Sequence, residues 1–104
     1  MVSELRKIVL DVLKPHEPDI VSLAQELAGL KGIEGVNISV YELDKRVENV
    51  KVTVEGRFTS IRDIQAVISG IGGSIHSIDE VIAGKKVVIE EDTLQDRVQE
   101  RERG

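Results

Sequence analysis

Cysteine is absent from this chain of 104 residues. Its absence excludes disulfide bridges, thiolate nucleophiles and metal sites built on soft sulfur ligands. The chain has two histidines, His16 and His76, and these are too few for a zinc site within one chain, because zinc takes three or four protein ligands. Any bound metal is therefore expected to be a hard cation with oxygen ligands.

Aromatic residues, basic clusters and long apolar runs are also scarce. Tyr41 and Phe58 are the only aromatic residues, which disfavours a surface for stacking nucleic-acid bases. The formal charge of −5 disfavours binding to a phosphate backbone. No apolar run approaches the roughly 18 residues of a membrane span, and residues 1–4 show no signal peptide. We expect a cytoplasmic protein without nucleic-acid or membrane partners, and its abundant Glu, Lys and Arg fit a thermophile composition.

The segment Val36–Gly56 reads as one antiparallel hairpin. Apolar β-branched residues alternate with polar ones on both arms, from Val36 to Tyr41 and from Val50 to Glu55. Alternation with a period of two indicates strands with one buried face. The polar stretch Asp44–Asn49 between the arms is expected to be the connecting loop.

A strand and a helix are expected before the hairpin. The strand runs from Leu5 to Leu13 and ends at the sequence Lys-Pro-His-Glu-Pro, where the prolines forbid continued pairing. The helix runs from about Pro18 to Leu30 and has an apolar stripe at helical spacing. Gly32 is the expected left-handed residue at its exit.

A second helix and a last strand follow the hairpin. Ser60 and Asp63 have the spacing of a capping box, and isoleucines at 61, 64, 68 and 71 form a helical stripe. The last strand begins at Ser74 and runs to about Ala83, with isoleucines of both parities, so either both of its faces are buried or a bulge shifts its phase. Residues 90–104 are almost all polar or charged and are expected to form a frayed helix or a disordered tail.

The order strand-helix-strand, strand-helix-strand predicts an α+β fold, the ferredoxin-like split β-α-β sandwich. Its antiparallel sheet would have the order 4-1-3-2, with both helices on one face, and the domain would span residues 1–89. The other face would be open and would carry Val9, Leu13, Tyr41 and Leu43, together with Ile78 and Ile82, which share one parity. Because such apolar patches commonly mark partner surfaces, and because the second strand is an unprotected edge, we expect a homo-oligomer rather than a monomer.

Candidate site residues fall in two places. Asp11 interrupts an apolar strand, where it either pairs with Lys51 of the adjacent strand or contacts a ligand or hard cation. His76, Asp79 and Glu80 of the last strand are the other candidate metal ligands, although no familiar metal-binding spacing connects them. The second place is the proline-bounded loop of His16 and Glu17, which either only joins strand to helix or holds an anion or metal. This loop should adjoin the hairpin loop and the Gly72-Gly73 turn.

Three long phrases of the sequence carry a family resemblance: VLDVLKPHEPDI, GVNISVYELDKRVENVKVTVEG and GGSIHSIDEVIAGKKVV. They closely resemble the archaeal domain-of-unknown-function family 211, over about residues 5 to 90. The resemblance implies a ferredoxin-like fold and homo-oligomers, for which a ring is one option. A bound divalent cation such as calcium would be in keeping with it, but it assigns no ligands and implies no established activity.

Three functional hypotheses follow. The favoured one is a non-catalytic module that binds a small ligand or a divalent cation, because the turn Gly32–Val36 resembles a glycine-rich turn of similarly folded amino-acid-sensing domains, which is an analogy of fold. The alternative is a structural or protein-interaction protein without a ligand. An enzyme is disfavoured, since acid–base chemistry would fall to Asp11, His76 and Glu80 alone.

Overall fold

The computed structural model of the protein describes residues 3–90. Six elements follow one another along the chain: β1 (Leu5–Pro15), α1 (Ile20–Ala28), β2 (Ile33–Leu43), β3 (Val47–Phe58), α2 (Arg62–Gly70) and β4 (Ser74–Ala83). The tail predicted for residues 90–104 lies outside the described residues apart from Glu90. Neither helix in the described part is long and apolar enough to cross a bilayer.

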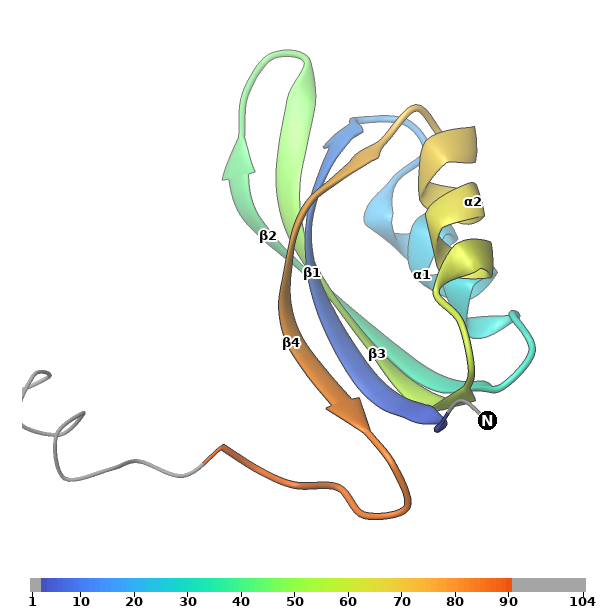
Figure 1. The fold of residues 1–104 in the computed structure, drawn as a ribbon. Helices are drawn as coiled ribbons and strands as arrows, with labels where there is room; N and C mark the ends of the chain where they lie inside the picture. Colours follow the sequence, from blue (N-terminus) through green and yellow to red (C-terminus); the bar gives the residue numbers. More distant parts are fainter. Residues whose placement is uncertain (1–2, 91–104) are drawn as a thin grey trace, which may run out of the picture.

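The four strands form one antiparallel sheet in the order β2-β3-β1-β4. Read from the other edge, this is the predicted order. Both helices lie on the same face of the strongly curved sheet, and the β2–β3 hairpin extends beyond them (Figure 1). The predicted α+β fold of the ferredoxin-like type is therefore confirmed.

The core lies between the helices and the helix-facing residues of the two central strands, β1 and β3. Alternation along each central strand places every second side chain in this layer, and the two helical stripes supply the opposite wall. Its buried members are Ile8, Leu10, Val12, Leu23, Leu27, Val50, Val52, Val54, Phe58, Ile64 and Ile68. Each of these residues belongs to a strand or helix predicted from its periodicity, except Phe58, which lies beyond the end of the predicted hairpin at Gly56.

Both central strands are longer than predicted at the end near the hairpin loop. β1 continues through Lys14 to Pro15, and β3 begins at Val47 rather than at Val50. The register pairs Lys14 with Glu48, and both side chains are largely buried. The predicted loop is thus shortened to residues 44–46. There the carboxylate of Asp44 accepts hydrogen bonds from the backbone N–H groups of Arg46 and Val47, at 2.9 and 3.2 Å.

The helix starts differ in detail from the prediction. Asp19 caps α1, because its side chain accepts a hydrogen bond from the Ser22 N–H at 2.9 Å, and Pro18 lies just outside the helix. At α2, the Ser60 hydroxyl accepts a hydrogen bond from the Arg62 N–H at 3.1 Å, two residues on rather than three. The predicted capping box is therefore replaced by a shorter turn, with Asp63 in the first turn of the helix.

β4 resolves the predicted ambiguity of its register by two bulges. The pairing with β1 shifts between Val9 and Leu10 and again between Asp11 and Val12, and the extra residues of β4 are Asp79 and His76. As a result Ile75, Ile78 and Val81 stand opposite core-facing residues of β1, although they are three positions apart. The bulges therefore place Ile75, Ile78 and Val81 on one face, and Ile82, opposite Lys7 on the other face, is also buried.

Candidate functional site

A cluster of charged groups joins the loop after β1 to the loop end of the β2–β3 hairpin. Nδ1 of His16 lies 3.0 Å from Oε1 of Glu48, and Nε2 of His16 lies 2.7 Å from the carbonyl oxygen of Asp44. The α2–β4 turn lies close to the same end of β1, since a Cβ built on Gly72 would lie 3.5 Å from Cγ of Pro15. The predicted meeting of these three loops at one end of the sheet is confirmed.

Lys14 of β1 is the third member of this cluster and lies on its buried side. Its side chain is fully buried, and its ammonium group donates a hydrogen bond to the Pro15 carbonyl at 2.7 Å and lies 3.5 Å from Oε2 of Glu48. Glu48 therefore stands between two cationic groups, one from each side. A buried carboxylate is costly unless it is paired in this way, which explains why the strand tolerates Glu48.

The hydrogen bonds of both ring nitrogens of His16 favour its doubly protonated, charged form. Both ring nitrogens face oxygen acceptors, and only the doubly protonated ring can donate to both at once. The hydrogen bond to Glu48, followed by the one to the Asp44 carbonyl, raises the pKa of His16 above its ordinary value of 6.5. This arrangement ties the loop to the hairpin, and it leaves Glu17, which is exposed, outside the cluster.

Asp11 lies on the open face of the sheet and is half-buried. The register places it opposite Lys51, as predicted, but its hydrogen-bond partner is Asn49, whose side-chain amide donates to Oδ1 at 2.5 Å. Part of its capacity to bind a ligand is thus already used by the neighbouring strand.

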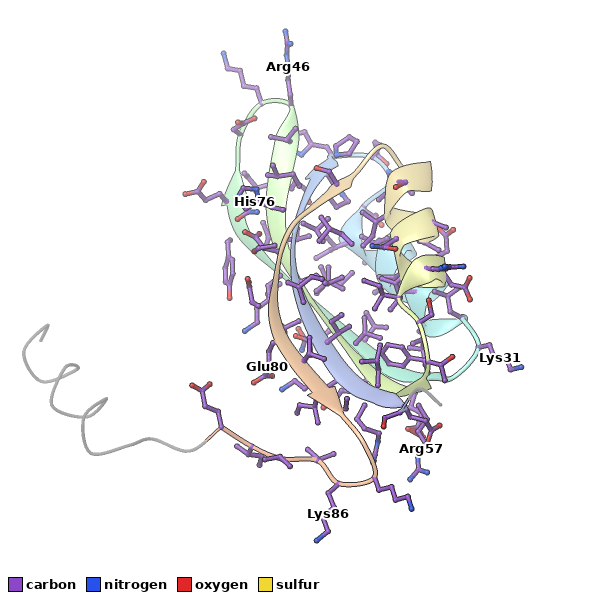
Figure 2. The ribbon with its side chains drawn as sticks, viewed as in Figure 1. Lys31, Arg46, Arg57, His76, Glu80 and Lys86 are labelled. Carbon is purple, nitrogen blue, oxygen red and sulfur yellow. The ribbon has the colours of Figure 1, made fainter. Side chains whose placement is uncertain are left out.

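The three candidate metal ligands of β4 are spread along the strand. His76 and Glu80 lie well apart in Figure 2, and Glu80 forms an ion pair with Lys7 at 2.9 Å. Asp79 accepts a hydrogen bond from the Ser77 hydroxyl at 2.7 Å. Within residues 3–90, no group of three or more His, Asp and Glu side chains is placed to hold a metal ion. The metal-ligand assignment stays a prediction.

The open face of the sheet is less apolar than the alternation suggested. Val9 and Ile82 are only 6% and 8% exposed. A bulge at Tyr41 shifts the register so that Leu43 pairs with Glu48, and Leu43 lines a hollow of about 460 Å³ together with Leu13 and Asn49 of the open face. Between β1, β2 and β3 this face also has a polar hollow of about 360 Å³, which Lys7, Tyr41 and Lys51 help to line.

A second hollow lies at the other end of the molecule, between the exit of α1 and the entrance of α2. Its volume is about 470 Å³, and residues 30–33 and 57–60 form most of its wall. The two segments are joined by a hydrogen bond of 2.7 Å from the Arg57 N–H to the Gly32 carbonyl. Gly32 has the predicted left-handed backbone, with φ of 84°. A Cβ on Gly56 would collide with the Gly32 carbonyl oxygen, so the close approach requires glycine.

Comparison with known proteins decides the family. The family model described as uncharacterized ArCR, domain-of-unknown-function family 211, matches residues 6–97. The chain belongs to this family. It is also 58% identical over 96 residues to an uncharacterized protein of Methanocaldococcus jannaschii, a match that covers 92% of this chain and 99% of that protein. This ArCR chain therefore has an archaeal relative of nearly the same length.

Four residues of this ArCR protein, in the His16 cluster and in the hollow of about 470 Å³, were not identified as site residues from the sequence. Lys14 was treated as part of a strand terminator and Glu48 as part of a loop, although each lies within a strand. Lys31 and Arg57, which line the hollow of about 470 Å³, carry no pattern that distinguishes them from surface residues. The sequence held only an indirect signal for these two residues. Lys31 is next to Gly32 and Arg57 is next to Gly56, and the close approach of the backbone requires both glycines.

Proposed function

We propose that this ArCR protein acts as a homo-oligomer and as a non-catalytic module that binds a small ligand or a divalent cation. The observation that carries the assembly is the exposed edge of β2. This strand has β3 as its sheet neighbour, and its outer backbone groups face away from the sheet. A second copy could continue the sheet by pairing with them.

The middle of β2 lacks the features that protect an edge strand. Between Gly35 and Val40 it keeps one register with β3 and has neither a proline nor a charged side chain. Its far end adds apolar surface, because Val40, Tyr41 and Leu43 are 38%, 62% and 66% exposed. A regular, uncharged edge of this kind is suited to pairing between copies.

The opposite edge of the sheet has a different character. β4 is interrupted by the bulges at His76 and Asp79, and it carries the ion-paired Glu80. Bulges and charges discourage pairing at an edge. β2 also has bulges, at Glu34 and Tyr41, but the six residues between them pair with β3 without interruption and carry no charge, whereas the bulges of β4 lie three residues apart. This uninterrupted stretch favours β2 over β4 as the contact strand.

The cation-binding part of the proposal involves Asp11, His76, Asp79 and Glu80. Since no three such groups converge within residues 3–90, a calcium site with several protein oxygens would draw on more than one copy or on other parts of the chain. Oligomerisation and cation binding would then be linked.

Light scattering combined with a thermal-shift screen tests this proposal on the full chain. The expected mass is a multiple of 11.5 kDa at micromolar concentration. A divalent cation or a small organic ligand is expected to raise the melting temperature, because binding to the native state stabilises it. A mass of one chain would overturn the assembly, and the absence of any thermal shift would overturn the ligand-binding role.

A further inference from the structure

The hollow between α1 and α2 combines an apolar wall with cationic side chains. Its apolar lining comes from Leu30, Ile33, Phe58 and Ile64, which belong to or pack against the core. Its volume of about 470 Å³ falls within the range of clefts that hold small organic molecules. We refer to it below as the α1–α2 cleft.

Two cations, Lys31 and Arg57, line this cleft. Both are exposed, and the ion pairs within residues 3–90 engage Lys7, Lys14 and His16 instead. The head groups of Lys31 and Arg57 are thus left without a carboxylate partner in that part of the chain. This is notable in a protein whose formal charge is −5.

A backbone hydrogen bond holds the main chains at Lys31 and Arg57 near each other. Lys31 immediately precedes Gly32, whose carbonyl oxygen accepts the 2.7 Å hydrogen bond from the Arg57 N–H. The left-handed turn at Gly32 and the glycine at position 56 permit this approach. The two side chains therefore start from backbone positions that are fixed relative to one another, which lowers the entropic cost of binding one ligand with both.

We propose that the α1–α2 cleft binds a small amphipathic carboxylate. The apolar body of the ligand would lie against Ile33 and Phe58, and its carboxylate would bind Arg57 and Lys31. A guanidinium group suits this task, because its parallel N–H groups match the two oxygens of a carboxylate. The inference rests on the proposed role as a ligand-binding module, and it is independent of the β2 edge.

Asp63 also lines the cleft, and its carboxylate can distinguish between two classes of ligand. An α-amino acid would offer its ammonium group to this carboxylate, whereas a simple carboxylic acid would not. The carboxylate and the apolar body are common to both ligand types. The experiment therefore compares probes that differ only in their polar group.

The probes are phenylpropanoate, L-phenylalanine and phenylpropylamine, titrated into the isotope-labelled full chain and followed by amide chemical shifts. We expect saturable shifts of Gly32, Ile33 and Ser60 with at least one of the two carboxylates and none with the amine. Tighter binding of phenylalanine would identify an amino-acid site, and tighter binding of phenylpropanoate a site for simple carboxylates. Absence of saturation with both, or equal binding of the amine, would overturn the proposal.

Arg46 provides the matched control, because it is exposed at the tip of the hairpin, at the end of the molecule opposite to Lys31 and Arg57 (Figure 2). Arg57→Gln is expected to weaken carboxylate binding by about fivefold or more, whereas Arg46→Gln, with the same loss of charge, should leave it unchanged. Equal effects of the two variants would show that the contact is non-specific and would contradict the proposal.

Light scattering on the same samples separates this inference from the proposed assembly. Saturable carboxylate binding by a monomer would support the cleft and overturn the oligomer. An oligomer that binds none of the three probes would leave the assembly standing and overturn the cleft as a carboxylate site.

Discussion

Nδ1 of His16 lies 3.0 Å from Oε1 of Glu48, and the two residues are 32 positions apart in the chain. This contact joins the loop between β1 and α1 to the start of β3. Lys14 lies on the other side of the same carboxylate, and the Asp44 carbonyl accepts from the other ring nitrogen. One end of the domain is therefore held by a charged cluster rather than by apolar packing.

The first prediction concerns pH. Because the folded-state pKa of His16 is raised, the protonated ring stabilises the fold fully below the ordinary histidine value of 6.5. This stabilisation is lost as the pH rises through the raised pKa. The urea concentration at the unfolding midpoint should therefore fall as the pH increases from 6.5 upward. His16→Gln should flatten this slope, and an unchanged slope in that variant would contradict the assignment.

The second prediction concerns the buried partners Lys14 and Glu48. Lys14→Met should lower the free energy of unfolding by about 2–4 kcal/mol, since it removes one cation from a largely buried carboxylate. The double variant Lys14→Met, Glu48→Leu should regain part of this loss, because no unpaired buried charge remains. Equilibrium unfolding in urea measures both values. If the double variant loses as much free energy of unfolding as Lys14→Met and Glu48→Leu lose together when each is made alone, the pair is not coupled.

The third prediction concerns the glycine crossing beside the α1–α2 cleft. Gly56→Ala should lower the free energy of unfolding by about 1–3 kcal/mol, because its Cβ would collide with backbone atoms of residues 32–34. Gly70→Ala is the control, since a Cβ at this helix position has no atom within 4 Å. It should be neutral or stabilising by up to about 1 kcal/mol. Equal stability of the two variants would contradict the close approach.

The fourth prediction concerns calcium. After treatment with a chelator, the full chain should show a higher melting temperature when calcium is restored. Asp79→Asn should reduce this increase, whereas Glu26→Gln, which removes an exposed carboxylate from α1, should not. If Asp79→Asn responds to calcium as the unaltered chain does, Asp79 is not a ligand.

The sequence predicted the fold well because periodicity reports burial directly. Alternating valines in β3 and isoleucine or leucine at helical spacing in α1 and α2 identify the core without any knowledge of partners. The order of elements then limits the topology to very few solutions. The same reasoning placed His16 beside the hairpin loop, because loops at one end of such a sheet must meet.

Features that depend on pairing between distant residues were harder to predict. Lys14 and Glu48 look like surface residues until the register brings them together inside the protein. The bulges at Tyr41, His76 and Asp79 change which face a side chain occupies, and alternation cannot reveal a change of phase. The backbones at Gly32 and Arg57 come together only because two turns cross at glycine residues.

The mass of two charge variants tests the proposed assembly most directly. Ser39→Lys places a charge on the uncharged part of the β2 edge, and Ser69→Lys places the same charge on the exposed surface of α2. By light scattering, the unaltered chain and Ser69→Lys should share one oligomeric mass, while Ser39→Lys should shift toward the single-chain value of 11.5 kDa. An unaltered chain with the mass of a monomer, or an undiminished mass for Ser39→Lys, would contradict assembly through β2.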